Sequence, residues 1–301
     1  MPGAKVKLGV ETPGEVPDLS ADHGNLMPLT EREYCLMRDL VYHRFGIHLG
    51  EHKRALIAGR LQKVVREQGF DNFSEYHDYL NRDATGEALT TLIDRISTNH
   101  TYFYREKDHF EFFFRTVLPE LAARERQSGR RTLHLWCPGC SSGEEPYTLA
   151  MLILEHFRRE MTGWDLGLLA TDISSRVLRK AQAGIYPAES VARLPRELAR
   201  AYFDRAPDGR GRVQDRVRQL VLFRRLNLMR PDYPFRGKFS VIFCRNVMIY
   251  FDPPTRQALT DRFHRVLEPE GYLFIGHSET LGRNDSRFRY VRPAVYQRVG
   301  S

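Results

Sequence analysis

The sequence predicts an α/β protein with a nucleotide-binding type of sheet and a small antiparallel β insertion, preceded by a small all-α domain. Three observations lead to this prediction. From Thr132 onward, apolar strand-like runs alternate with helical patterns, which is typical of a parallel sheet with helices on both faces. The first run ends in a turn of small residues before a helix, where open α/β sheets bind nucleotides. Residues 30–97 show helical periodicity and no strand signal.

Composition narrows the class of protein. The chain has 301 residues, enough for two domains, and its apolar content of 42% is ordinary for a globular protein. No apolar run reaches the ~20 residues that cross a bilayer, and a secretory signal pattern is missing, so no membrane insertion is expected. Four cysteines are too few for a disulfide scaffold, which favours a cytoplasmic protein. The formal net charge of +8 suits an anionic partner, and equally a solvated basic surface.

The N-terminal part is expected to be a flexible tail followed by four helices. Residues 1–29 are rich in Pro, Gly and small polar residues and show no periodicity. Thr30 and Glu33 form a capping-box pattern, so the first helix should begin there and run to about Arg44. Further helices are expected over residues 51–68, 73–82 and 85–97. Residues 98–131 are expected to form a linker and a connecting helix.

The α/β domain is expected over residues 132–301. Its predicted strands are 132–136, 166–171, 239–244 and 271–276, and its predicted helices are 146–160, 174–183 and 253–267. Residues 205–226 break this alternation, because a turn signal at Asp208-Gly209 and a β-rich run predict the antiparallel insertion. Two short aromatic runs over 287–298, around Pro293, predict a closing hairpin at the sheet edge.

The turn after the first strand is followed by two carboxylates, Glu144 and Glu145. They would repel a phosphate group and suit a ligand with cationic or hydroxyl groups. The turn also lacks the GxGxxG spacing and the Lys-Ser/Thr ending of phosphate-binding loops. Asp172 closes the second strand, where an acidic residue is placed to accept hydrogen bonds from ribose hydroxyls. The alternative is a helix cap, formed by Asp172 or Ser174.

The same turn contains a Cys-Pro-Gly-Cys sequence, Cys137 to Cys140. It could be a redox pair or half of a zinc site. A second CxxC or a close pair of histidines is missing from the sequence, and the neighbouring acidic pair would raise rather than lower a thiol pKa. Neither a redox pair nor a metal site is therefore expected.

Two further segments should face the same crevice. Arg245 and Asn246 follow a hydrophobic strand, which places them at its carboxyl end. An arginine there suits an anionic acceptor that needs hydrogen-bond donors, or else a structural pair with a carboxylate. The segment from Ser97 to Arg105 joins the two domains. It could cross the mouth of the sheet and supply ligand contacts, or simply form a capped interdomain helix.

Together these motifs resemble one family, the chemotaxis receptor glutamate methyltransferases of bacteria. The resemblance covers about Glu31 to Arg298 and is most specific at CSSGEEPY (140–147), ATDIS (170–174), FCRNVMIYF (243–251) and GHSE (276–279). The helical domain matches through GIHLGEHKRALIAGRL at 46–61. The resemblance implies a nucleotide-fold methyltransferase domain of the class I type. It also implies transfer of a methyl group from S-adenosylmethionine to receptor glutamates, which leaves a glutamyl methyl ester and S-adenosylhomocysteine.

The resemblance also implies site residues. Cofactor contacts are expected from Asn99, Thr101, Arg105, Glu145, Asp172, Asn227, Leu228, Arg245 and Asn246. Within this set, Asp172 should hold the ribose, and Asn227-Leu228 should lie near the adenine. Arg105 and Tyr250 are expected to orient the substrate carboxylate, and no metal is expected. The flank of the second helix formed by Arg60, Lys63 and Arg66 is expected to dock on the acidic methylation helices of a receptor, unless it is a merely solvated face.

Three functional questions stay open at this stage. A nucleic-acid methyltransferase would fit the positive charge, but it would need hydrogen-bond acceptors where Arg245 stands, so no nucleic acid partner is expected. A non-catalytic module that senses S-adenosylmethionine is disfavoured by the polar residues at the cofactor positions. Members of the family differ in whether the β insertion binds a receptor's C-terminal peptide, and the short turn from Asp208 to Arg212 leaves both alternatives open.

Overall fold

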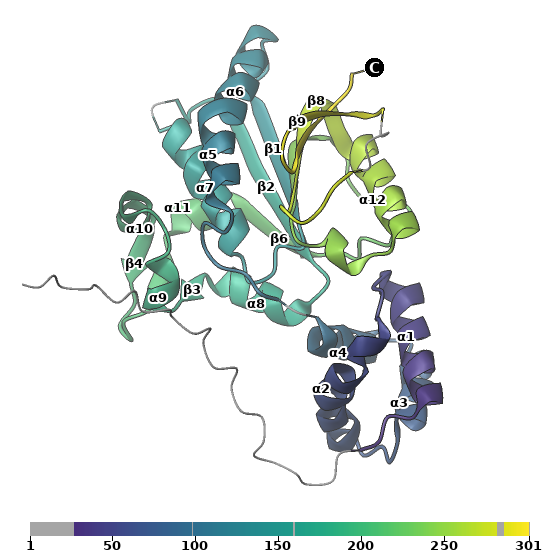
Figure 1. Cartoon of the computed structure of the whole chain (residues 1–301). Coiled ribbons are helices and arrows are strands. Elements are labelled where there is room, and N and C mark those ends of the chain that lie inside the picture. Colours follow the sequence, from purple (N-terminus) through teal and green to yellow (C-terminus); the bar gives the residue numbers. More distant parts are fainter. Residues whose placement is uncertain (1–26, 98, 159, 282–285, 301) are drawn as a thin grey trace, which may run out of the picture.

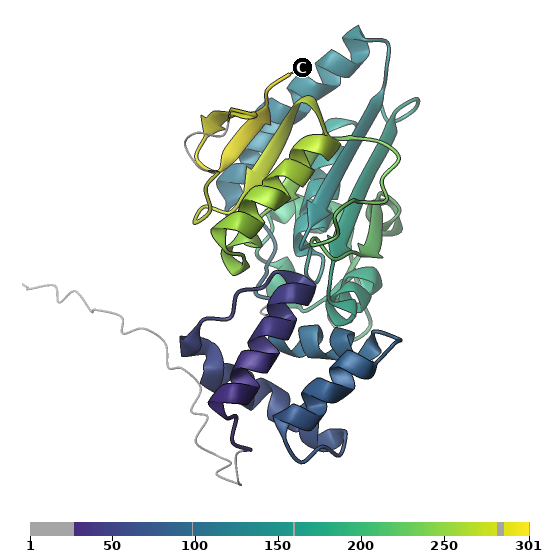
Figure 2. The ribbon, with the colours of Figure 1, turned by 90° about the vertical axis from the view of Figure 1, so that its right-hand side faces the viewer.

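The computed structural model describes residues 27–97, 99–158, 160–281 and 286–300. A small helical domain lies against the carboxyl ends of the strands of a larger α/β domain (Figures 1 and 2). Most of the expected tail, residues 1–26, lies outside the described residues. Among the described residues, no helix combines the length and the apolar character needed to cross a membrane.

The four predicted helices of the N-terminal domain are present. They are α1 (Glu31–Phe45), α2 (Arg54–Glu67), preceded by the 3-10 turn η1 (Glu51–Lys53), α3 (Phe73–Arg82) and α4 (Glu87–Ile96). Thr30 caps α1 in a reciprocal capping box with Glu33, as the sequence predicts. The apolar faces of the helices close over one core, which includes Tyr34, Leu61 and Leu92.

The α/β domain is built on a seven-stranded sheet whose strand order is β6-β2-β1-β7-β8-β10-β9. The strands are β1 (Thr132–Pro138), β2 (Asp165–Asp172), β6 (Val221–Arg225), β7 (Phe239–Cys244), β8 (Leu267–Ile275), β9 (Phe288–Arg292) and β10 (Val295–Arg298). The first five run parallel, whereas β10 pairs antiparallel with β8 and with β9. The predicted closing hairpin is therefore present at the sheet edge.

Helices cover both faces of this sheet (Figure 1). One core contains residues of α5 (Lys107–Phe112), the π-helical turn η2 (Phe113–Val117), α6 (Leu118–Gln127), α7 (Glu144–His156) and α8 (Ser175–Ala183). The opposite core contains residues of α12 (Pro253–Val266). Neighbouring residues of β1 separate the two cores, since Leu135 belongs to the first and Trp136 to the second.

The predicted insertion is wrong in its bounds. A small antiparallel sheet exists, but its order is β3-β5-β4, from β3 (Ile185–Tyr186), β5 (Gly211–Val213) and β4 (Phe203–Arg205), so it begins well before residue 205. Two short helices, α9 (Ala188–Val191) and α10 (Arg196–Tyr202), lie within it, and α11 (Asp215–Arg218) follows it. The run 221–225 is β6, which pairs in parallel with β2. Val221 and Phe223 are buried, whereas Leu222 is exposed. This alternation occurs both in an edge strand and in an antiparallel hairpin, so the sequence pattern does not distinguish the two.

Chain order reverses between β1 and β7, since β2 and β6 lie on one side of β1 and β7 and β8 on the other. This is the switch point at which open α/β sheets form a ligand crevice. Contacts between the two domains are made here. The backbone N–H of His48 donates to the carbonyl of Tyr250 at 2.8 Å, and the amide of Asn227 donates to the carbonyl of Arg44 at 2.7 Å. The helical domain therefore forms one wall of the crevice.

Candidate active site

A cavity of roughly 1550 Å³, its open mouth included, lies between the two domains at the carboxyl ends of β1, β2 and β7. Its lining includes ten residues predicted as cofactor or substrate contacts: Asn99, Thr101, Arg105, Glu145, Asp172, Asn227, Leu228, Arg245, Asn246 and Tyr250. Arg60 of the predicted docking flank also lines it. Lys63 and Arg66 are exposed on α2, away from the cavity lining. Residues 99–102 and Arg105 line the cavity, which agrees with the sequence interpretation that the interdomain segment lies at the mouth of the sheet.

Asp172 braces the turn that follows β1. One carboxylate oxygen accepts from the backbone N–H of Ser141 at 2.9 Å, and the other accepts from that of Ser174 at 2.9 Å. The cap of α8 is Ser174, whose hydroxyl accepts from Val177. Burial raises the pKa of Asp172, and the backbone hydrogen bonds oppose that rise. Each carboxylate oxygen has a second lone pair, so Asp172 can still accept from a ligand hydroxyl.

Glu145 and Arg245 form a buried ion pair at the floor of the cavity. Nη1 of Arg245 lies 3.2 Å from Oε2 of Glu145, and its Nη2 lies 3.4 Å from Oε2 of Glu106. The Arg245 side chain is 1% exposed, and it also donates to the carbonyl of Arg105 at 2.5 Å. Burial raises the pKa of Glu145 and the Arg245 charge lowers it.

These contacts favour the second sequence interpretation of Arg245, a structural pair with a carboxylate, over a direct role toward an anionic acceptor. The Arg245 charge is matched by two carboxylates of the protein itself, which is the structural pairing that the sequence had left as the alternative. The strand-end position was predicted correctly. The partner Glu106 could not be identified in advance, because it belongs to the linker and meets Arg245 only through the fold.

The cysteines of the turn are packing residues. Cys137 and Cys140 are buried and free, and the thiol of Cys137 donates to Glu145 at 3.2 Å. Burial raises the pKa of both thiols well above the ordinary value, and neighbouring carboxylates raise it further. Neutral thiols of this kind are poor nucleophiles, which argues against a redox pair.

Strained backbone clusters around the cavity. Among the described residues, six that are not glycine have positive φ, and four of them adjoin the site: Tyr104, Glu106, Ser141 and Asn246. The Asn246 conformation, with φ of 58°, is held by Glu279, whose carboxylate accepts from its backbone N–H at 3.0 Å. The same carboxylate accepts from Ile249 and Gly276. Sequence reasoning did not assign Glu279 a role, although it ends the GHSE segment.

The outer part of the cavity is basic. Lys53, Arg60 and Arg105 line it together with Tyr250. The Lys53 ammonium lies 5.9 Å from the centre of the Tyr250 ring. Burial raises the pKa of Tyr250, and the charges of Arg105 and Arg60 oppose that rise. The inner part holds Glu145 and Asp172, together with Arg245, whose charge is matched by Glu145 and Glu106. The balance of charge is therefore basic at the mouth of the cavity and acidic at the strand ends.

The buried lining atoms without a hydrogen-bond partner among the described residues include Nδ2 of Asn99 and Oγ of Ser141. Together with the carboxylates of Glu145 and Asp172, they fit a ligand that carries hydroxyl groups and positive charge. A phosphate-rich nucleotide would be repelled by these carboxylates.

Comparison with known proteins identifies the domains. Residues 99–296 match the family described as "CheR methyltransferase, SAM binding domain", and residues 32–97 match "CheR methyltransferase, all-alpha domain". A "Chemotaxis protein methyltransferase" of Borreliella burgdorferi is 42% identical over 270 residues, 90% of this chain and 95% of that protein. The "Chemotaxis protein methyltransferase" of Escherichia coli is 35% identical over 275 residues, 90% and 92% of the two chains.

Fold, cavity and comparisons together define the class of protein, a methyltransferase with a domain that binds S-adenosylmethionine. More particularly, the chain belongs to the CheR methyltransferase family.

Proposed function

We propose that the chain transfers a methyl group from S-adenosylmethionine to glutamate side chains on the cytoplasmic helices of bacterial chemoreceptors, in chemotactic adaptation. The observation that carries this proposal is the change of sign across the cavity. Acidic residues at the strand ends suit a cationic donor, and basic residues at the mouth suit an anionic acceptor. The "Chemotaxis protein methyltransferase" relatives support the same substrate class.

The inner residues would hold the cofactor. Asp172 would accept from the ribose hydroxyls, Glu145 would lie near the positive charge of the donor, and Asn227-Leu228 would lie beside the adenine. Asn99, Thr101, Arg245 and Asn246 complete the proposed contacts. When bound, S-adenosylmethionine supplies a sulfonium methyl group that is already activated for in-line displacement.

The outer residues would receive the acceptor. A glutamate with a reference pKa of about 4.3 is ionised near neutrality, so no general base is required. The task of the protein is then to orient the carboxylate and to replace the water that it loses. Arg105 and Tyr250 have the hydrogen-bond donors for this role, and both line the cavity beside Arg60.

Arg105→Ala tests this role directly. We expect turnover on receptor substrate to fall about 100-fold, the usual loss when a donor to the reacting group is removed. Arg193→Ala is a matched control, because Arg193 also packs over Tyr102 but does not line the cavity. Normal turnover by Arg105→Ala would contradict the assignment.

The receptor surface is a further part of the proposal. The flank formed by Arg60, Lys63 and Arg66 would dock on the acidic helices that carry the methylated glutamates. The enzyme would act in the cytoplasm, where those helices lie. A receptor C-terminal peptide could also add to an edge of the small sheet, beside β4 or β3, by strand addition. Anisotropy of a labelled peptide with and without the enzyme tests that second contact.

The substrate class is tested by offering three acceptors separately with labelled S-adenosylmethionine: receptor-containing membranes, receptor-free membranes and duplex DNA. We expect label only on the receptor band. Label on DNA, or equal label on receptor-free membranes, would contradict the proposed substrate.

A further inference from the structure

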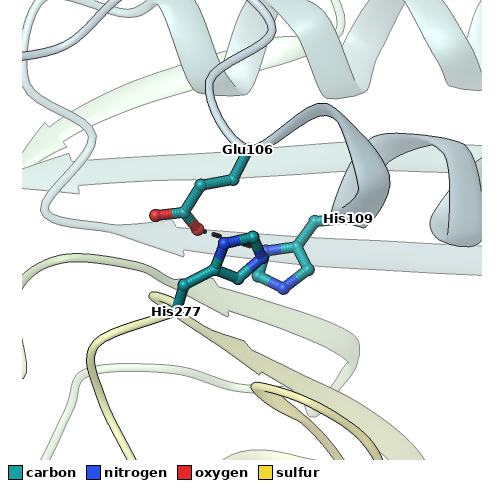
Figure 3. A group of neighbouring side chains, drawn as sticks. All are labelled: Glu106, His109 and His277. Atoms are coloured by element: carbon teal, nitrogen blue, oxygen red, sulfur yellow. Dashed lines mark ion pairs between the residues drawn. The ribbon is translucent and has the colours of Figure 1, made fainter.

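Three side chains that do not line the cavity meet beside it: Glu106, His109 and His277. Each offers one ligand-type atom, and these atoms all lie within 4.8 Å of one another. Figure 3 shows that they come from three places, the linker just before α5, α5 itself and the loop after β8, and that they point toward one another. The sequence predicts no metal, because a second CxxC and a close pair of histidines are missing. These three residues come together only in the fold.

His109 is the unusual member. Its side chain is fully buried, yet neither ring nitrogen has a hydrogen-bond partner among the described residues. Its Nδ1 lies 3.4 Å from Oε2 of Glu106, a buried oxygen that has no hydrogen-bond partner but also forms an ion pair with Arg245 at 3.4 Å. Burying polar atoms without hydrogen-bond partners is unfavourable, so the ring nitrogens of His109 point to a ligand beside this carboxylate.

The spacing suits a small divalent cation. Around Zn²⁺, nitrogen and oxygen ligands at ~2.1 Å in a tetrahedron stand about 3.4 Å apart. The pair formed by His109 and Glu106 already has this spacing. The three ligand atoms lie within 4.8 Å of one another, so the His277 side chain, which is 44% exposed, has to move by ~1.4 Å at most to reach this spacing. Oδ2 of Asp108 lies 3.3 Å from Nε2 of His277, as a carboxylate that orients a metal-bound imidazole does.

The geometry points to a transition-metal site, best suited to Zn²⁺, formed by Glu106, His109 and His277 and supported by Asp108. Two histidines and one glutamate are a recurrent zinc ligand set that leaves a coordination position open. The exposed edge at His277 gives the ion a path from solvent. A bound ion would tie the linker to the end of β8. Because Glu106 also contacts Arg245 and Asn246, it would steady the strained turn at the floor of the active site.

Calorimetric titration of the full chain with zinc chloride tests the site, after any tag is removed and metals are stripped with a chelator. We expect one equivalent to bind, and zinc to raise the melting temperature. His277→Ala should weaken binding at least about tenfold and abolish the thermal shift. His43→Ala removes an exposed histidine of α1 and should bind zinc like the wild type. Magnesium at the same concentration should not bind, because it prefers all-oxygen ligands.

Equal zinc affinity for wild type and His277→Ala would overturn the site, as would an equal loss in His43→Ala. Glu106→Gln is a second variant, which keeps the shape of the side chain and removes its charge. Unchanged zinc binding by Glu106→Gln would also overturn the proposal. Zinc binding is measured without methyl donor or receptor, so its outcome is independent of the proposed reaction.

Discussion

Arg245 shows how far residue type and position can be interpreted from sequence. Its place at the carboxyl end of β7 follows from the hydrophobic run before it, and the structure agrees. Its partners do not follow, because Glu145 and Glu106 reach it only through the turn after β1 and the linker. Local patterns predict where a strand ends, whereas pairing across the sheet depends on tertiary packing.

Arg245→Met should destabilise the protein by roughly 3–5 kcal/mol at pH 7, because it leaves two carboxylates that are only 15% and 16% exposed without a counter-charge. The loss should be smaller at pH 5 than at pH 7, because burial raises the pKa of Glu145 and favours its protonation as the pH falls. Urea denaturation at both pH values measures it, with exposed Arg230→Met as the control. Equal unfolding midpoints for the two variants would show that the ion pair has no structural role.

His109 should make stability depend on pH. Burial, followed by the nearby Arg245 charge, lowers the pKa of His109 to about 4. Between pH 6.5 and 4 the unfolded chain therefore binds a proton that the folded chain does not, so the contribution of His109 falls as pH falls. In chelator-treated protein, the stability advantage of wild type over His109→Gln should drop by roughly 2–3 kcal/mol from pH 7 to pH 4.5. A constant difference across this range would contradict the assigned cause.

At the scale of elements, the positions of the helices and strands were easier to predict from the sequence than the pairing of the strands. The main helices and the β1 turn follow from periodicity and capping residues such as Thr30. The prediction for residues 205–226 was wrong because β6 is an edge strand with one buried face. An alternating pattern shows that a strand is half-buried, but it does not show which strand is its neighbour. The small sheet uses β3, only two residues long, which is too short for a sequence signal.

The turn after β1 should tolerate a methyl group at Gly139 poorly. Gly139 has φ of 71°, and an added Cβ would lie 2.3 Å from Cγ2 of Val247. Gly69 has φ of 80° but nothing within 4 Å of its Cβ position. Gly69→Ala should therefore cost about 1–2 kcal/mol from backbone strain alone, and Gly139→Ala about 1–3 kcal/mol more from the overlap. Chemical denaturation compares the two, and equal losses would show that the Val247 side chain moves aside freely.

At the scale of the whole molecule, the cavity exists because the helical domain covers the switch point of the sheet. Contacts such as Asn227 to Arg44 join segments 183 residues apart. The sequence predicted the classes of both domains and ten lining residues as cofactor or substrate contacts, whereas it did not predict the apolar lining. It could not predict that Arg60 turns into the cavity while Lys63 stays exposed, since both lie on the same flank of α2.

This division of the flank predicts separate effects on receptor docking. The double variant Lys63→Glu and Arg66→Glu should raise the KM for receptor several-fold at low salt and leave kcat nearly unchanged, because neither residue lines the cavity. Added salt should reduce the difference from wild type. Arg82→Glu is the matched control, because the Arg82 side chain of α3 is exposed. A KM unaffected by the double variant would identify the flank as a solvated face.

The bond that the enzyme makes tests the central claim most directly. Receptor membranes are incubated with the wild-type chain and methyl-labelled S-adenosylmethionine, and the washed product is treated with alkali. A carboxylate acceptor predicts that the label is released as volatile methanol, because a glutamyl methyl ester hydrolyses under these conditions. Label that stays with the protein after alkali would instead indicate methylation of nitrogen, and would contradict glutamate as the acceptor.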